Sequence, residues 1–257
     1  MNPPPTNRPL MKTQEHTYRK THIVFGFYLN PNSAWADILD GQLDDLSNYG
    51  LLDAANLHVV VTNPSGVEGV AEIIAKRSAT AHVREYSENT YEYWALKYAW
   101  DLAKNDSSCR LAYFHSKGIS YDITKRTSFE RNLTRETFRP WKQIIRLLEE
   151  DSIRKIGLFP SIEGWIWFNF WWTTGDYLNS LPEPVISEDR YSHESWLHRT
   201  ALPKVNDCWS LYAGKAQRFN VESTNKRMRA LSKSKILQLP TLRRLWLRAE
   251  SLMTPNS

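Results

Sequence analysis

The sequence has few of the residues that stabilise small secreted or metal-binding domains. It contains 2 cysteines in 257 residues, Cys109 and Cys208, and their separation matches no metal-binding motif. This scarcity excludes a disulfide scaffold and fits a reducing compartment. No apolar stretch reaches the roughly 20 residues needed to cross a bilayer, and the first 22 residues lack the apolar segment of a signal peptide. We therefore expect a cytoplasmic protein.

Acidic residues are scarce near the carboxyl end. Residues 215–257 contain ten Lys/Arg and two Asp/Glu, a net charge of +8, whereas the whole chain carries +5. Residues 1–214 therefore carry the difference, which is −3. The basic character belongs to the tail and says little about the ligand of the rest of the chain.

The tail contains a predicted amphipathic helix over residues 241–252. Its apolar face holds Leu242, Leu245, Trp246, Ala249 and Leu252, and three arginines lie around the other side. Such a helix fits the surface of an anionic membrane, and it fits equally well as a terminal helix packed on the main domain. We expect no nucleic-acid binding, because the aromatic residues lie away from the basic segment.

Apolar runs and helical patterns alternate along the chain and predict its fold. Short runs typical of buried strands occur at residues 23–29, 57–61, 81–86, 111–114 and 156–159. Helical spacing is found at residues 34–49, 66–77, 91–104, 128–150 and 187–197. The alternation predicts an α/β domain with an open, mostly parallel sheet flanked by helices. We expect this domain at residues 21–214, after a disordered lead-in at 1–20 and before the basic tail at 215–257.

Residues 165–172 form an aromatic run that holds 4 of the 11 tryptophans, with Asn169 in its middle. Such a run is typical either of the inside of a core or of a wall on which a flat or sugar-like ligand lies.

A second feature is the predicted strand 111–114, which leads directly into His115-Ser116-Lys117-Gly118. Ligands of open α/β sheets bind beyond the carboxyl ends of the strands. A lysine there can neutralise a diphosphate, and Gly118 allows close approach of the backbone. Alternatively, the tetrapeptide is a polar turn that ends a strand.

Four segments together carry a resemblance to a known family. They are Leu111–Gly118, Asn169–Trp172, Leu181-Pro182 and Arg190-Tyr191-x-x-Glu194-x-Trp196. In this order they resemble a family of bacterial and viral glycosyltransferase-like proteins over roughly residues 22–213. The family is similar to nucleotide-diphospho-sugar transferases of the GT-A fold. The resemblance implies transfer of a sugar from a nucleotide-sugar donor to a polysaccharide or lipid-linked glycan, as in the synthesis of lipopolysaccharide O-antigen or capsule.

The resemblance also implies a donor site. His115 and Lys117 would lie where that fold places a metal-binding Asp-x-Asp motif, which this strand end lacks. Lys117 would then neutralise the departing diphosphate with His115 beside it, and no residue is assigned as a metal ligand. A divalent metal, Mg²⁺ or Mn²⁺, is the alternative. Tyr28 and Asn89 would border the nucleotide, together with Gly118.

Glu194 is the candidate base of an inverting hexosyl transfer, which needs a carboxylate to accept the proton of the acceptor hydroxyl. Arg190 lies four residues earlier, on the same face of a helix, and would hold the donor phosphate. Alternatively the two residues form an ordinary helix ion pair, and Asp189 or Glu188 is the base. Asn169, Trp172 and Tyr191 would shape the sugar and acceptor site, with Phe170 and Trp171 in the core.

One segment departs from the family pattern. Residues 165–168 are Trp-Ile-Trp-Phe, where the family has His, an aromatic residue, Ser and Gly. The change would alter the choice of acceptor or abolish activity. Two functions from other classes therefore stay open: a non-catalytic nucleotide- or glycan-binding module of the same fold, and a membrane-associated scaffold.

Overall fold

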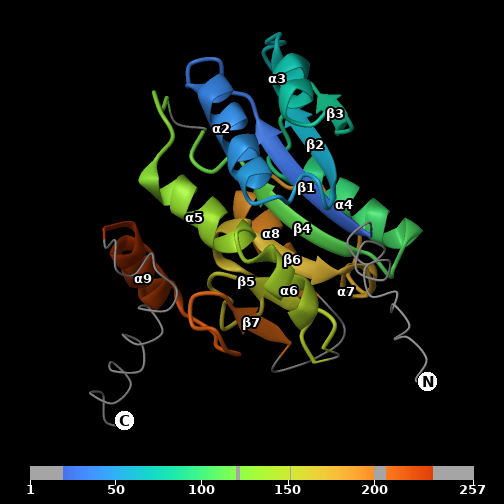
Figure 1. Ribbon diagram of the computed structural model, residues 1–257, viewed down its shortest axis with the longest axis vertical. Coiled ribbons are helices and arrows are strands. Elements are labelled where there is room, and N and C mark those ends of the chain that lie inside the picture. Colours follow the sequence, from blue (N-terminus) through green and yellow to red (C-terminus); the bar gives the residue numbers. More distant parts are fainter. Residues whose placement is uncertain (1–19, 120–121, 151, 200–206, 234–257) are drawn as a thin grey trace, which may run out of the picture.

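The computed structural model describes residues 20–119, 122–150, 152–199 and 207–233. In this part of the chain a seven-stranded sheet has the strand order β3-β2-β1-β4-β6-β5-β7 (Figure 1). The strands are β1 (Thr21–Tyr28), β2 (Asn56–Thr62), β3 (His82–Tyr86), β4 (Arg110–His115), β5 (Lys155–Gly157), β6 (Trp171–Thr174) and β7 (Cys208–Ser210). β6 runs antiparallel to both of its neighbours, and the other pairs are parallel. The predicted α/β class with a mostly parallel sheet is confirmed.

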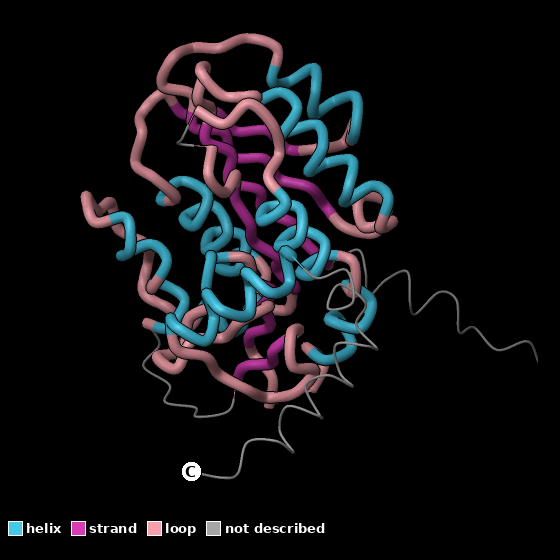
Figure 2. The backbone as a smooth tube through the Cα atoms, turned by 90° about the vertical axis from the view of Figure 1, so that its left-hand side faces the viewer, coloured by secondary structure: helices cyan, strands magenta, loops and turns pink. Residues whose placement is uncertain are grey.

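Helices surround this sheet, which runs through the middle of the molecule (Figure 2). The α-helices are α2 (Trp35–Asn48), α3 (Val70–Arg77), α4 (Tyr93–Asn105), α5 (Ser128–Phe138), α6 (Trp141–Leu147), α7 (Gly175–Asn179), α8 (Arg190–Glu194) and α9 (Val221–Lys233). Two short 3-10 turns are η1 (Trp167–Asn169) and η2 (Trp196–His198).

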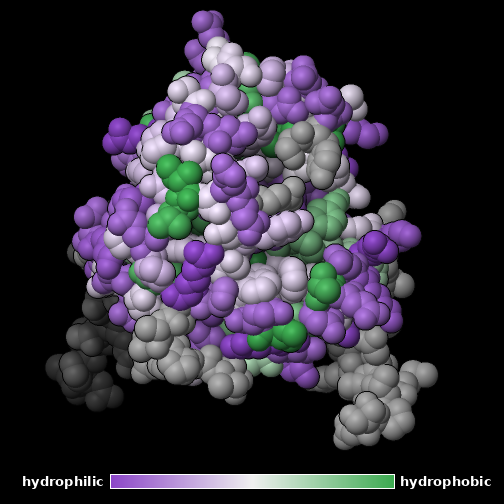
Figure 3. Space-filling model, turned by 180° about the vertical axis from the view of Figure 1, so that it is seen from behind, coloured by the Kyte–Doolittle hydropathy of each residue, from purple (hydrophilic) through white to green (hydrophobic). Residues whose placement is uncertain are grey.

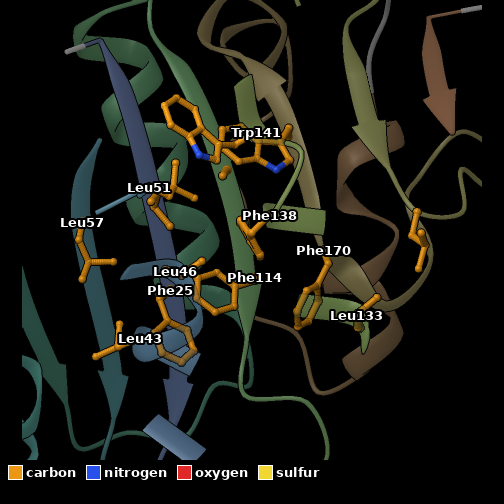
Figure 4. Close-up of a cluster of buried hydrophobic side chains, with 14 of the residues drawn as sticks. Phe25, Leu43, Leu46, Leu51, Leu57, Phe114, Leu133, Phe138, Trp141 and Phe170 are labelled. Carbon is orange, nitrogen blue, oxygen red and sulfur yellow. The ribbon is translucent and has the colours of Figure 1, made fainter. Parts of the chain in front are cut away.

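Alternating side chains of the strands divide the core into two clusters. On β4, Phe114 belongs to the cluster beneath α2, α5 and α6, whereas Tyr113 belongs to the cluster beneath α4 and α7. Phe114 stacks on Phe25 of β1 at 4.1 Å and meets Phe138 edge-on at 4.7 Å between ring centroids (Figure 4). Both faces of the central strands are therefore buried, which explains their continuous apolar runs.

The aromatic run is mainly core. Phe170 and Trp172 lie in the first cluster and Trp171 lies in the second, because β6 alternates between the two faces of the sheet. Phe170 and Trp171 therefore lie where the sequence placed them. β6 itself was not predicted as a strand.

Two predicted helices are shorter than expected. The helix predicted over 128–150 is interrupted after α5, and α6 begins directly after Pro140. Proline has no backbone N–H and cannot continue a helix from the preceding turn, which explains the break. The helix predicted over 187–197 is reduced to α8 and the turn η2.

The first described part of the tail packs on the domain. Thr224, Met228 and Leu231 of α9 are buried, and α9 contacts α5. The predicted lead-in and the helix over 241–252 lie outside the described residues, and the domain boundaries stay predictions. Within the described ranges no helix is long and apolar enough to span a bilayer. On the face seen in Figure 3 the described residues are mainly hydrophilic, with hydrophobic side chains in small separate groups.

Candidate functional site

A cavity of about 350 Å³ opens at the carboxyl ends of β1 and β4. β1 pairs with β2 on one side and with β4 on the other. The order in which successive strands are added to the sheet therefore reverses at this point. Open α/β sheets bind ligands at such switch points. Six of the predicted site residues line the cavity: Tyr28, Asn89, His115, Lys117, Gly118 and Glu194.

The segment after β4 is fixed by the end of β1 and by the residues that follow it. The Ser116 hydroxyl accepts a hydrogen bond from the Tyr28 backbone N–H at 3.0 Å. Asn30, which follows β1, donates to the Ile119 carbonyl at 3.1 Å and to the Asp122 carboxylate at 3.2 Å. These bonds hold the chain on both sides of Lys117 and Gly118. The tetrapeptide is therefore a turn that ends a strand, and it also lines the cavity.

Lys117 and Glu194 form an ion pair within the cavity. The Lys117 Nζ lies 3.6 Å from the Glu194 Oε1, and both side chains are largely buried, at 21% and 16% exposed. Lys117 also lies 5.9 Å from the centre of the Phe168 ring. The motifs around Lys117 and Glu194 are far apart in the sequence, and the fold brings these two side chains together.

His115 is held by a backbone carbonyl. Its Nε2 lies 3.1 Å from the Phe168 oxygen, a distance at which the ring N–H donates. Burial lowers the pKa of His115 and the Lys117 ammonium lowers it further, whereas Glu92 and Glu194 oppose this shift. The neutral ring with its proton on Nε2 leaves Nδ1 as an acceptor.

Glu92 is a cavity residue that the sequence analysis missed. It is the residue before the first turn of α4, where an acidic side chain is ordinarily explained by the helix dipole. Its Oε2 accepts from the Tyr113 hydroxyl at 2.8 Å and from Asn169 Nδ2 at 2.5 Å. Its Oε1 lies 3.7 Å from His115 Nε2. The only signal in the sequence is its place three residues after Asn89.

Three residues at or near the cavity have a positive φ, which is unfavourable for residues that carry a side chain. Among the described residues, the non-glycine residues with positive φ are Tyr91 at 56°, Phe168 at 70° and Asn169 at 56°. Tyr91 lines the cavity, and the other two carry hydrogen-bond partners of His115 and Glu92. Such conformations cost about 1–3 kcal/mol each and are concentrated at functional sites.

Three of the residues predicted for the sugar and acceptor site do not line the cavity. Trp172 is fully buried in the core, where its Nε1 donates to the Thr137 carbonyl at 3.0 Å, because β6 turns it away from the site. Tyr191 is 64% exposed on the outer face of α8. Asn169 is 1% exposed and lies behind Glu92. Arg190 begins α8, and its side chain lies outside the described part of the structure.

A divalent metal is the alternative to Lys117, and the cavity residues that could ligate one are Glu92, His115 and Glu194. Mg²⁺ and Mn²⁺ prefer several carboxylate or carbonyl oxygens. Among the described residues no group of three or more His, Cys, Asp or Glu side chains is arranged to hold an ion. The Lys117 ammonium instead occupies the turn after β4, next to the Glu194 carboxylate.

Comparisons with known proteins find similarity among solved structures. No protein-family profile matches this chain, and no curated protein matches it by sequence. It is similar to a cytidylyltransferase from Leptospira borgpetersenii, with 12% identity, a TM-score of 0.40, and 93% of this chain and 98% of that chain covered. It is also similar to a mannosyltransferase from Pyrobaculum calidifontis in complex with GDP-Man and Mn²⁺, with 11% identity, a TM-score of 0.42, and 94% and 66% covered. Both TM-scores are below 0.5, so these similarities carry no conclusion on function.

Proposed function

We propose that the protein is a glycosyltransferase that uses a nucleotide-sugar donor. The observation that carries this proposal is the pairing of Lys117 with Glu194 in a cavity at the switch point of the sheet. A transferase of this kind needs a cation beside the leaving diphosphate and a carboxylate beside the acceptor hydroxyl. The cavity offers both groups on different elements, the turn after β4 and the helix α8.

In the proposed donor complex, the diphosphate displaces Glu194 as the partner of Lys117. Tyr28 and Asn89, which line the cavity, border the nucleotide, and Gly118 allows the phosphates to approach the backbone, at a φ of 85°. His115 contributes a neutral ring. Arg190, the first residue of α8, is assigned to the donor phosphate, and the exposed Tyr191 is assigned to the acceptor.

The proposed reaction is a direct displacement. The acceptor hydroxyl oxygen attacks the anomeric carbon and forms the new glycosidic bond, while the bond between that carbon and the diphosphate oxygen breaks. Glu194 accepts the hydroxyl proton, and the diphosphate leaves with the bonding electron pair beside Lys117. Release of Glu194 from Lys117 when the donor binds frees the carboxylate to act as a base.

The acceptor is proposed to be a polysaccharide or lipid-linked glycan of the cell surface, with the protein in the cytoplasm against an anionic membrane. The exposed face of α9 carries Lys226, Arg229 and Lys233 beside the basic residues that follow it. Lys226→Glu with Arg229→Glu should weaken flotation with phosphatidylglycerol vesicles, by roughly five-fold for each charge removed. Equal flotation of the variant and the unchanged chain would contradict the membrane proposal.

A donor screen tests the function. A panel of UDP-, GDP-, dTDP- and CMP-sugars is measured for thermal stabilisation of the full chain, since a bound donor stabilises by mass action. Donors that bind are then assayed for release of the nucleotide. Glu194→Gln should lower turnover by about 10²–10⁴-fold while donor binding is kept, and binding should survive EDTA.

The outcomes separate the candidate functions. Full turnover by Glu194→Gln shows that this residue is not the base. Donor binding without turnover of any acceptor or water indicates a non-catalytic binding module. A strict requirement for Mn²⁺ contradicts the role given to Lys117. Glu222→Gln, an exposed position in the first turn of α9, serves as the matched control.

A further inference from the structure

The Glu92 carboxylate has two unlike oxygens. Oε2 accepts two hydrogen bonds, from the Tyr113 hydroxyl and from the Asn169 amide. Oε1 has the His115 ring at 3.7 Å and lies in a side chain that lines the cavity and is 16% exposed. A carboxylate oxygen has lone pairs for two hydrogen bonds. Oε1 therefore has acceptor capacity for a ligand.

The orientation of Asn169 is determined by its neighbours. Trp171 Nε1 can only donate, and it lies 2.7 Å from Asn169 Oδ1, so the amide oxygen faces the indole. The amide nitrogen must then face Glu92, at 2.5 Å. Both polar atoms of this buried side chain have protein partners, Nδ2 with Glu92 and Oδ1 with Trp171. Asn169 acts on a ligand through Glu92 rather than by contact.

The backbone on both sides of this hydrogen bond is strained. Asn169 itself has a φ of 56°, and Tyr91, the residue before Glu92, also has a φ of 56°. The two residues joined by the bond are 77 positions apart in the sequence. The backbone is therefore unfavourable at both ends of the hydrogen bond between Asn169 and Glu92. This indicates that the fold maintains the position of the Glu92 carboxylate.

We infer that Glu92 binds the sugar part of the ligand by accepting hydrogen bonds from its hydroxyl groups, and that Asn169 and Tyr113 are positioning residues for its carboxylate. The inference rests on the proposed function. An ionised carboxylate accepts and does not donate, so it selects hydroxyl or N–H groups and repels phosphate. The cavity therefore offers a cation, Lys117, for the diphosphate and an acceptor, Glu92, for the sugar hydroxyls.

The two carboxylates of the cavity consequently have different tasks. Glu194 is paired with Lys117. In the proposed complex the diphosphate replaces Glu194 as the partner of Lys117, and the Glu194 carboxylate is then free for proton transfer. Glu92 keeps its two hydrogen bonds, which require it to remain an acceptor. Glu92 is thus a sugar-binding residue, and Glu194 is the base.

The test compares two ligands that differ by the sugar. Titration calorimetry measures the affinity of the full chain for the nucleotide-sugar that stabilises it most, and for the nucleoside diphosphate of the same base. Glu92→Gln should lower the affinity for the nucleotide-sugar by at least about ten-fold, since hydrogen bonds to charged groups are worth this much. Affinity for the nucleoside diphosphate should not change. Glu88→Gln, exposed and outside the cavity, is the matched control.

Tyr113→Phe is the second variant. It removes one hydrogen bond to Oε2 and leaves the carboxylate in place. The ratio of the affinity for the nucleotide-sugar to the affinity for the nucleoside diphosphate should therefore fall by a few-fold. It also provides the measurement if Glu92→Gln does not fold. A purely structural role for Tyr113 would lower both affinities together.

Each outcome is decisive. An unchanged ratio in Glu92→Gln overturns the inference, as does an equal loss for both ligands. Loss of turnover with the ratio intact also overturns it, because Glu92 would then be the base. If the unchanged chain binds no nucleotide and no nucleotide-sugar, the proposed function fails and this inference fails with it.

Discussion

Phe168 has a φ of 70°, a conformation that favours glycine, at the position where the family that the sequence resembles carries glycine. Its carbonyl accepts the His115 hydrogen bond, and its ring packs edge-on against Phe129 at 5.1 Å between centroids. Phe168 therefore combines a backbone conformation that favours glycine with a large side chain. The ring fills space beside Lys117 that a glycine would leave open.

Tyr91 allows the backbone strain to be measured. Its N–H is bound by Asn89 Oδ1 at 3.2 Å, and its side chain is 48% exposed. Tyr91→Gly and Tyr91→Ala remove the same side chain, but only glycine adopts a positive φ without cost. In urea unfolding, the glycine variant should be more stable than the alanine variant by about 0.5–1 kcal/mol. An alanine variant as stable as the glycine variant would show that this turn is not strained.

At the level of single residues, the sequence identified the groups that stand in short motifs. His115, Lys117 and Gly118 follow a strand directly, and such residues reach the edge of the sheet whatever the rest of the fold does. Glu92 could not be found in this way. Its partners Tyr113 and Asn169 are distant in the sequence, and their contact depends on the order of the strands. Trp172 was assigned to the ligand for the related reason that its face of β6 was unknown.

Among the elements, the close approach of α4 to β1 controls where Glu92 lies. A Cβ added to Gly26 would be 2.9 Å from the Ala95 Cβ and 3.3 Å from the Tyr113 hydroxyl. Gly26→Ala should therefore destabilise the protein by about 1–3 kcal/mol, because α4 must shift away from β1. It should also weaken binding of a nucleotide-sugar, since Glu92 lies at the start of α4.

A double-mutant cycle checks this contact. Ala95→Gly removes the atom that the new Cβ would meet, at a cost of about 1 kcal/mol for a glycine in a helix. If the helix contact is the cause, the double variant should be more stable than the sum of the single effects predicts, by at least about 0.5 kcal/mol in urea unfolding. If the two changes in stability are strictly additive, the destabilisation by Gly26→Ala does not come from contact with Ala95.

The strands of the parallel half of the sheet were predicted from the sequence, and in the other half the run at 156–159 predicted β5, whereas β6 and β7 were not predicted. β1, β2, β3 and β4 are long enough for their apolar runs to stand out between helical patterns. β5 and β7 have 3 residues each and β6 has 4. Such lengths carry no periodicity. The antiparallel insertion of β6 between β4 and β5 is a property of the fold that no local pattern encodes.

For the molecule as a whole, acid stability depends on a histidine cluster away from the cavity. His58 on β2 is 4% exposed and lies between His22, at 2.9 Å, and the Tyr98 hydroxyl, at 3.0 Å. Its ring stacks on His82 with 4.9 Å between centroids. Burial is the main cause that lowers the pKa of His58 to about 3, and the neighbouring His22 and His82 contribute to this shift.

The sign of the effect follows from this lowered pKa. Between pH 6.5 and 3 the unfolded chain binds a proton at His58 and the folded chain does not. The contribution to stability is complete above pH 6.5 and is lost as the pH falls through this window, at about 1.4 kcal/mol per pH unit. Urea unfolding from pH 6.5 to 5 should show this slope. His58→Phe should reduce it, whereas Tyr98→Phe, which removes the hydroxyl and keeps the imidazole, should retain it. A slope that persists in His58→Phe would assign the acid sensitivity of the whole fold to other groups.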